Sequence, residues 1–261
     1  MVTSDHQDRT CICALCLVLL SLLVGPARSR AQVGSAGTLA PSPLSLDDQL
    51  SPHPPSMFSI GGLVSGRTYT ILYAGGLAAA LLWNVGDPQQ VSRDLNNSRI
   101  EPLMDPGNIY GSGWVTGGGS LAVLATGTLS GSRGLKALGE DLCKSYLLSG
   151  ALAGLIKLSV NRRRPLGGPY SFPSGHATSA FATVPVLAQH LGWWGGAPAL
   201  GLATATALGR LEDSRHYVSD VIFGAALGLA VGEVVAHQRG ERNLLEKIAI
   251  TPDGVGVALQ F

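Results

Sequence analysis

The sequence predicts an all-α fold, a six-helix bundle followed by a short C-terminal β-hairpin. Apolar segments of helical character recur through the chain, and no long stretch shows the period-2 alternation of a strand. The apolar segments cover approximately residues 69–85, 114–130, 142–156, 177–191, 197–209 and 221–237. Small residues also recur four positions apart, as expected where helices pack closely. These observations together indicate one helical domain in the middle of the chain.

The small residues lie in three of these segments. They are Gly150 and Gly154; Gly201, Ala205 and Gly209; and Gly224, Gly228 and Gly232. Residues four apart share one face of a helix, so each set predicts a ridge on which a neighbouring helix packs closely. Such ridges occur in membrane bundles and in tightly packed soluble bundles, and they do not decide between the two.

The first 31 residues have the features of an export signal. The apolar stretch Cys11–Gly25 follows Arg9, and the small residues Ser29 and Ala31 suit the positions before a cleavage point. We therefore expect cleavage after Ala31 and export to the periplasm, with an uncleaved membrane anchor as the alternative. Of the four cysteines only Cys143 lies outside this segment, so no intramolecular disulfide is expected.

The rest of the chain divides into a linker, the helical domain and a C-terminal extension. Residues 32–56 are rich in Pro and Ser and are interpreted as a linker, and residues 57–240 hold the helical domain. In the extension, residues 241–261, the turn signal Pro252–Gly254 precedes alternating apolar residues that end at Phe261. This pattern predicts a hairpin packed on the bundle.

The composition indicates a chain that is largely buried, and it argues against nucleic-acid binding. Hydrophobic residues make up 46% of the chain and charged residues 13%, with a formal net charge of +1. A chain so close to neutral has no general attraction for nucleic acid. Most apolar segments fall short of the roughly 20 residues that span a bilayer. We therefore expect a soluble exported domain, with an integral membrane bundle as the alternative, and the oligomeric state stays open.

Three short blocks carry the residues that chemistry on a phosphate-shaped anion requires. They are KLSVNRRRP at residues 157–165, PSGH at 173–176 and GRLEDSRHYVSD at 209–220. Arg164 and Arg210 offer planar forks that each grip two oxygens, and Lys157 contributes a point charge. A phosphoryl group in transfer spreads negative charge over its oxygens, so these three cations are candidate phosphate-binding residues.

Ser174 and Gly175 are expected to begin a helix and to bind phosphate there. Serine is a good N-cap, glycine permits close approach of the backbone, and the free N–H groups of a first turn favour an anion. Other polar residues near the three blocks are given structural or surface positions. Arg162 and Arg163 are predicted to lie on a solvated basic face, Glu212, Asp213 and Arg215 on a surface loop, and His190 to be structural.

Two histidines divide the remaining chemistry between them. His216 and Asp220 are four residues apart, so on a helix the carboxylate reaches one imidazole nitrogen and leaves the other free to attack phosphorus. His176 then remains to protonate the leaving oxygen and later to activate water as a general acid and base. These three side chains are the candidate catalytic residues.

The three blocks together resemble the superfamily of type 2 phosphatidic acid phosphatases, class A acid phosphatases and vanadium haloperoxidases. The family pattern is Lys, six residues, Arg-Pro; then Pro-Ser-Gly-His; then Ser-Arg, five residues, His, three residues, Asp. Two departures are visible: Gly209 stands where the family most often has Ser, and only seven residues separate Pro165 from Pro173. This gap is shorter than expected of the family, which suggests a small lid or substrate loop. The resemblance implies a helical bundle in which His216 is a phosphohistidine nucleophile and His176 the acid.

The resemblance also implies a function. We expect a metal-independent exported phosphohydrolase without a cofactor, which cleaves phosphomonoesters, pyrophosphates or lipid phosphates and is inhibited by vanadate. Its partner is then a phosphorylated small molecule or lipid, and membrane association is compatible with it. Three alternatives stay open: an integral-membrane lipid phosphatase with the same site, a haloperoxidase with vanadate as cofactor, and a non-catalytic helical anion-binding protein.

Overall fold

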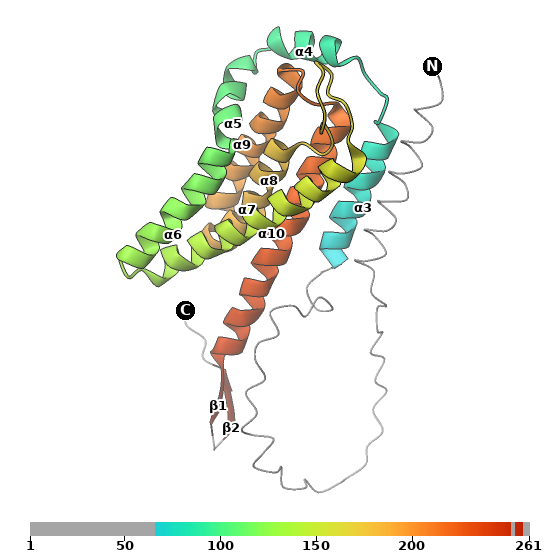
Figure 1. The fold of residues 1–261 in the computed structure, drawn as a ribbon. Coiled ribbons are helices and arrows are strands. Elements are labelled where there is room, and N and C mark those ends of the chain that lie inside the picture. The colour runs from blue at the N-terminus through green and yellow to red at the C-terminus, as the bar shows by residue number, and fades with distance from the viewer. Residues whose placement is uncertain (1–65, 252–253, 258–261) are drawn as a thin grey trace, which may run out of the picture.

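Helices make up most of the described part of the chain, residues 66–251 and 254–257, in this computed structural model (Figure 1). The helices are α3 (Gly66–Leu81), α4 (Pro88–Asn96), η2 (Glu101–Leu103), α5 (Met104–Tyr110), η3 (Trp114–Gly118), α6 (Gly119–Leu129), α7 (Arg133–Val160), α8 (Gly175–Leu191), α9 (Trp193–Glu212) and α10 (Val218–Lys247). Each apolar segment expected from the sequence overlaps one of them, which confirms the all-α prediction. The structure adds α4, η2 and α5 between the first two segments.

The C-terminal strands are short and follow α10 directly. Strand β1 (Ile248–Thr251) pairs antiparallel with β2 (Gly254–Val257), and Ile248 lies opposite Val257. Helix α10 continues to Lys247, past the domain boundary expected at residue 240. The predicted signal segment, the linker and the first residues of the predicted domain lie outside the described residues.

Helix α7 is much longer than the expected segment 142–156. Its 28 residues begin after Ser132, whose hydroxyl accepts a hydrogen bond from the N–H of Leu135. It ends where Asn161 takes a left-handed conformation (φ 45°) and its N–H bonds the carbonyl oxygen of Lys157. The first three turns, 133–144, are rich in charge. A search for apolar segments therefore misses this part of the helix.

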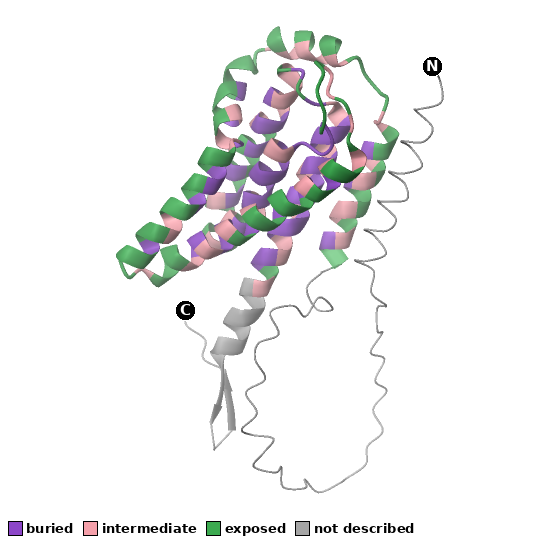
Figure 2. Ribbon diagram, in the orientation of Figure 1, coloured by how far each residue is buried: buried purple, intermediate pink, exposed green. Residues whose placement is uncertain are grey.

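Helix α8 lies at the centre of the bundle and packs against α7, α9 and α10 (Figure 1). Most of its first ten residues are buried (Figure 2). A Cβ added at Gly224, Gly228 or Gly232 would lie only 2.3 to 2.7 Å from a backbone oxygen of this region. The predicted glycine ridge of α10 is therefore confirmed, because these glycines let α10 pack directly on the backbone of α8.

The other predicted small-residue ridges mostly lack a packed neighbour. A Cβ added at Gly150, Gly154 or Gly201 would meet nothing within 4 Å. The prediction that these glycines support close packing is wrong within the described chain, because they lie on outer faces of α7 and α9. Leucines around the α7 pair are also exposed, with Leu155 63% and Leu158 67% accessible.

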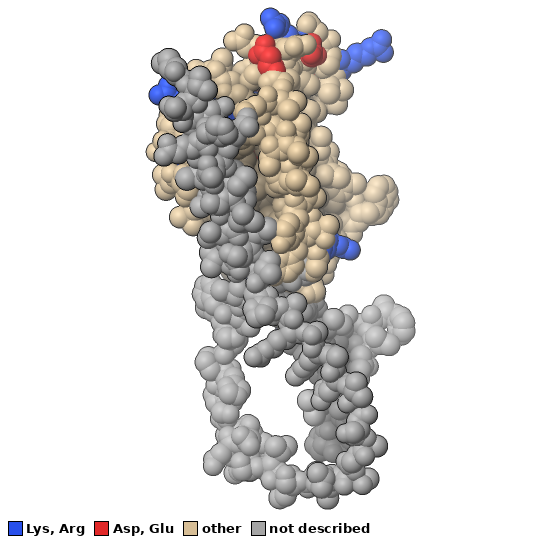
Figure 3. All heavy atoms as spheres, turned by 90° about the vertical axis from the view of Figure 1, so that its right-hand side faces the viewer, with Lys and Arg blue, Asp and Glu red and all other residues tan. Residues whose placement is uncertain are grey.

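An apolar belt surrounds the middle of the bundle. We define it by the charge-free stretches 68–81, 119–129, 145–156, 177–189, 193–209 and 221–232. Large apolar side chains are exposed along it on three further helices. They include Leu77 and Leu81 on α3, Leu121 and Leu129 on α6, and Leu200 and Leu202 on α9. In Figure 3 the acidic and most basic side chains of the visible face gather at the end of the bundle that carries α4.

One described helix could cross a membrane by length and composition, the Val218–Gln238 part of α10, with a mean hydropathy of 1.8. This feature has little weight by itself, because 67% of its most apolar window is buried in the bundle and a core helix has the same composition. The exposed leucines of the apolar belt are a separate observation. Core packing does not account for them.

Candidate active site

The predicted site residues meet at one end of the bundle, where α7 and α9 end and α8 and α10 begin (Figure 1). Lys157 lies in the last turn of α7 and Arg210 in the last turn of α9, while Gly175 begins α8. The N–H of Ser174 donates to the carbonyl oxygen of Asp220 at 2.9 Å and joins the start of α8 to the start of α10. Residues far apart in the sequence therefore form one polar cluster.

His216 and Asp220 form a buried pair. The imidazole Nδ1 lies 3.6 Å from Asp220 Oδ2, and the two residues are 4% and 0% exposed. The Ser171 hydroxyl donates to the same carboxylate oxygen and lies 3.5 Å from Nδ1, and the N–H of Tyr217 donates to that oxygen at 3.0 Å. Burial lowers the pKa of His216, although Asp220 opposes this effect. With Nδ1 turned toward the carboxylate, Nε2 remains for chemistry.

Arg162 holds the other oxygen of that carboxylate. Its Nη1 donates to Asp220 Oδ1 at 2.6 Å and to Ser219 Oγ at 2.7 Å. Its guanidinium lies between the rings of Trp83 and Tyr217, with centroids at 3.7 and 4.0 Å. The side chain is only 11% exposed, so the prediction of a solvated position is wrong for Arg162. No sequence pattern pairs it with a carboxylate 58 residues away.

Lys157 holds the loop that leads into α8. Its Nζ donates to the carbonyl oxygens of Tyr170 at 2.8 Å and Pro173 at 2.5 Å. The same loop is closed further back, where the N–H of Arg164 donates to the carbonyl oxygen of Gly168 at 2.9 Å. Gly168 has φ +90°, a backbone conformation that favours glycine. The short segment between the first two motif blocks is therefore a tight turn against the site.

Two buried polar atoms at the site have no hydrogen-bond partner among the described residues, Ser174 Oγ and Arg164 Nε. Ser174 is fully buried and occupies the N-cap position of α8 with extended backbone, as predicted, but its hydroxyl does not cap the helix. Leaving such atoms unpaired is costly unless a ligand satisfies them. One donor is a guanidinium nitrogen and the other a hydroxyl beside a helix start, so an oxyanion suits both.

His176 lies in the field of the site's cations. Its pKa is lowered to about 4, and burial is the largest cause. The positive charge of Arg210 is the next largest cause, and His216, Lys157 and Arg164 lower the pKa further by smaller amounts. The cations therefore converge on this imidazole. A phosphate group bound among them would offset their charge and raise the pKa of His176, which favours the protonated form when substrate is present.

Arg210 is held by two side chains. Its Nε and Nη2 both donate to Asn108 Oδ1, at 3.1 and 2.5 Å, and Nη2 also donates to Asp213 Oδ2 at 2.6 Å. The Asp213 side chain is 41% exposed, in line with the predicted surface position, although it pairs with Arg210 of the site. Asn108 lies on α5, outside all three motif blocks. No sequence pattern connects Asn108 with Arg210, because 102 residues separate them.

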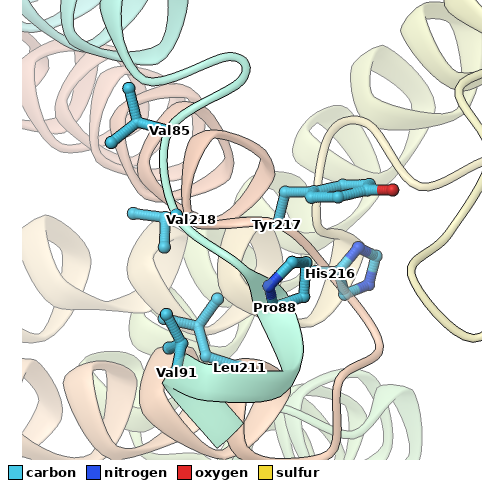
Figure 4. Close-up of a pocket in the computed structure, with 8 residues that line it drawn as sticks. Val85, Pro88, Val91, Leu211, His216, Tyr217 and Val218 are labelled. Atoms are coloured by element: carbon cyan, nitrogen blue, oxygen red, sulfur yellow. The ribbon is translucent and has the colours of Figure 1, made fainter.

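A small crevice lies beside His216 (Figure 4). It is small, with room for about one water molecule. Its lining comes from the α3–α4 connection, α4, the end of α9 and the start of α10. The lining residues are Val85, Gly86, Pro88, Val91, Leu211, His216, Tyr217 and Val218. Most of these residues are uncharged, and polar and apolar atoms contribute about equally to the exposed surface beside the candidate nucleophile.

In the described part of the chain, no group of three or more His, Cys, Asp or Glu side chains has the arrangement to hold a metal ion. Two acidic groups near the site are paired with arginines: Asp220 with Arg162 and Asp213 with Arg210. Independence from metal stays a prediction that activity measurements have to test.

Comparison with known proteins connects this region to a family. Residues 167–244 match the PAP2 superfamily, and this segment holds the second and third motif blocks. The chain is similar to the lipid A 1-phosphatase of Porphyromonas gingivalis, with 34% identity over 106 residues that cover 38% of this chain and 24% of that protein. It is also similar to the decaprenylphosphoryl-5-phosphoribose phosphatase of Mycobacterium tuberculosis, with 36% identity over 107 residues, 37% of this chain and 59% of the relative.

The chain thus aligns with less than two thirds of the length of these curated relatives. Among solved structures, it is similar to a transmembrane PAP2 type phosphatidylglycerolphosphate phosphatase from Bacillus subtilis. That likeness has a TM-score of 0.35 and 20% identity, and it covers 69% of this chain and 90% of the other. The family match confirms the resemblance over residues 167–244, which are similar to the PAP2 superfamily and hold the second and third motif blocks; the first block precedes the matched residues.

Proposed function

We propose that the protein is a membrane-embedded phosphatase that cleaves phosphate esters of lipids through a phosphohistidine on His216. One observation carries the proposal. His216 is held by Asp220 through Nδ1, while Lys157, Arg164 and Arg210 converge on the same end of the bundle. A buried imidazole with one nitrogen anchored and cations around it is suited to attack a phosphoryl group.

The proposed reaction has two steps. Nε2 of His216 attacks phosphorus, and a P–N bond forms as the P–O bond to the leaving group breaks. His176 gives its proton to the leaving oxygen. Water then attacks the phosphohistidine while His176 accepts its proton, the P–N bond breaks, and inorganic phosphate leaves with His216 regenerated. The Nδ1 to carboxylate distance of 3.6 Å is long for a hydrogen bond, as catalytic contacts often are before substrate binds.

The polar atoms around the histidines have a defined task in this reaction. Arg164 Nε and Ser174 Oγ lack partners among the described residues, so both are available to the equatorial oxygens of the phosphoryl group. Arg162 has a different position, because it bonds Asp220 and stacks between aromatic rings. We assign Arg162 to the support of Asp220, and through it to the orientation of His216.

The apolar belt supports a membrane location. Its exposed leucines, such as Leu121 and Leu155, form the kind of surface that soluble proteins rarely expose over a large area. Helix α9 has 20 residues and is therefore about 30 Å long, close to the thickness of a bilayer's hydrocarbon core. This location replaces the soluble exported domain expected from the sequence. That expectation rested in part on the shortness of the apolar segments, and four of the six lie within longer helices, α7 to α10.

A lipid substrate agrees with this location. The site lies at helix ends, outside the charge-free stretches, where a phosphate at the membrane surface would meet it. Both curated relatives are named for phosphorylated lipids, lipid A and decaprenylphosphoryl-5-phosphoribose. These arguments favour a lipid phosphate over a small water-soluble ester.

The test is phosphate release by the purified full chain in detergent micelles and in phospholipid vesicles. Phosphatidic acid and a soluble aryl phosphate serve as the two substrates, and His216→Asn is the inactive control. We expect extraction to require detergent and the lipid phosphate to have the higher kcat/KM. A chain that is soluble without detergent and prefers the soluble ester would support the exported phosphohydrolase instead. Absence of phosphate release from every substrate would contradict the proposed reaction.

A further inference from the structure

Arg210 reaches the site with its guanidinium already fixed by a neutral side chain from another helix. Nε and Nη2 share the carbonyl oxygen of Asn108, at 3.1 and 2.5 Å, which sets both the position and the plane of the guanidinium. An amide oxygen orients an arginine without neutralising its charge. The second partner, Asp213, is a carboxylate with 41% exposure, and a phosphate oxygen could replace it.

The backbone at Gly209 makes room for this arrangement. A Cβ added there would lie 2.4 Å from Asn108 Oδ1, 2.7 Å from its Cγ and 2.8 Å from its Nδ2. These distances are too short for any side chain to coexist with the carboxamide in this position. The family pattern most often has serine at the position of Gly209. The glycine of this chain leaves free the space that the Asn108 carboxamide occupies.

Close packing of α5 on α9 holds Asn108 in place. A Cβ added at Gly107 would lie 2.3 Å from the carbonyl carbon of Ala205, so the two helix backbones are in direct contact. The Thr206 hydroxyl donates to the carbonyl oxygen of Gly107. Asn108 follows Gly107 directly, and Arg210 lies four residues after Thr206, one helical turn further on. The contact between the helices therefore fixes both partners of the Asn108 to Arg210 interaction.

We propose that Asn108 is a positioning residue for Arg210 in phosphate binding, and that Gly209 is required to admit it. The inference rests on the proposed function, because it concerns the same phosphate site. Asn108 acts through Arg210 and not through the substrate. Its removal should leave Arg210 free to stay on Asp213, so that substrate has to compete with a carboxylate for a guanidinium that is no longer oriented.

A double-mutant cycle on kcat/KM tests the coupling, with Asn108→Ala, Arg210→Ala and the double variant in the full chain. Asn108→Ala should lower kcat/KM roughly 10- to 100-fold, as expected for a lost hydrogen bond to a charged group. Arg210→Ala should lower it further, and the double variant should be no worse than Arg210→Ala alone. Additive losses would mean that Asn108 does not act through Arg210. Asn96→Ala is the matched control, since the Asn96 side chain donates to the carbonyl oxygen of Ser92 in its own helix α4.

Gly209→Ser provides the second arm. Alone it should lower both kcat/KM and the melting temperature, because the new Cβ overlaps the Asn108 carboxamide. Combined with Asn108→Ala it should recover the melting temperature, while kcat/KM stays low unless the new hydroxyl orients Arg210. Gly209→Ser that is as stable and as active as the wild type would overturn the steric part of the inference.

The two proposals fail in different ways. If the wild type releases phosphate and Arg210→Ala is impaired while Asn108→Ala is as active as the Asn96→Ala control, the positioning role is wrong and the phosphatase assignment stands. If the wild type releases no phosphate, binding of inorganic phosphate to the wild type and the same variants still tests the pair. If Asn108→Ala weakens phosphate binding only when Arg210 is present, the positioning role is supported even without turnover.

Discussion

Among the described residues, histidine–aspartate pairs with a buried carboxylate lie at opposite ends of the central helix α8, and only the pair at its start belongs to the candidate site. Beside the start of α8, His216 Nδ1 lies 3.6 Å from Asp220; at its far end, His190 Nε2 lies 3.0 Å from Asp141. Both carboxylates are 0% exposed. The tighter pair is the one that sequence reasoning considers structural. A short histidine–carboxylate contact therefore does not identify a catalytic site.

The surroundings of the two pairs are what differ. Lys144 lies 3.8 Å from Asp141, and Ser145 one turn along bonds a backbone oxygen of α8. At the other end Arg162 binds the carboxylate, several cations act on His176, and two buried polar atoms have no partner among the described residues. Convergent positive charge and unsatisfied donors indicate an anion site, whereas an imidazole paired with a carboxylate is by itself a structural contact.

Replacing His216 and replacing His190 should differ more in their effect on turnover than any other two changes considered. His216→Asn keeps an amide near Asp220 but removes Nε2, so turnover should fall at least about 10,000-fold, as for other nucleophile deletions. His190→Gln keeps a nitrogen near Asp141, and kcat should stay close to that of the wild type. The assay is phosphate release at saturating substrate. Comparable losses in the two variants would contradict the distinction between the pairs.

His176→Ala should separate substrates by their leaving groups. An acid catalyst contributes about 100- to 10,000-fold when the leaving oxygen needs a proton, and little when it does not. We therefore expect a large loss with alkyl phosphates and a smaller one with aryl phosphates, measured as kcat/KM for a graded series. Equal losses across the series would argue against His176 as the acid.

Arg162→Met should weaken both stability and turnover. Removing one partner from a buried ion pair typically costs about 3–5 kcal/mol, and Asp220 would be left with a desolvated charge. Turnover should fall about 10- to 100-fold, because Asp220 would orient His216 less well. Thermal unfolding and kcat measure the two effects. Arg162→Lys, which keeps the charge but not the planar fork, should recover part of the stability; a stable and fully active Arg162→Met would contradict the support role.

The sequence predicts this site unevenly. Its three motif blocks hold every residue proposed to contact phosphate. The blocks lie where helices begin or end, so the fold brings them to one end of the bundle. It misses Arg162 and Asn108 as site residues, because their partners lie 58 and 102 residues away and depend on how α5, α7, α9 and α10 pack. The glycine ridge at Gly224 is predictable because its period matches the helix. The outward-facing Gly150 has the same spacing and lacks a neighbour, so periodicity alone cannot show which faces are packed.

The pH dependence of stability gives a smaller effect with a definite sign. The pKa of His176 falls from an ordinary value of 6.5 to about 4 on folding, so the unfolded chain binds more protons between these values. Its contribution to stability is present above pH 6.5 and is lost as the pH falls toward 4. His176→Asn should therefore show a smaller drop in melting temperature between pH 7 and pH 4.5 than the wild type. Added vanadate should reduce the wild-type drop, because a bound anion raises the pKa of His176; identical slopes for both proteins would contradict this.

The most direct test of the central claim is the identity of the phosphorylated residue during turnover. The full chain is mixed with substrate labelled in its phosphate group, denatured at alkaline pH to preserve phosphohistidine, and digested for mass spectrometry. The account predicts label on His216, none on His190, and no labelled histidine in the His216→Asn variant. Turnover without any labelled protein, or label on a residue other than His216, would contradict it.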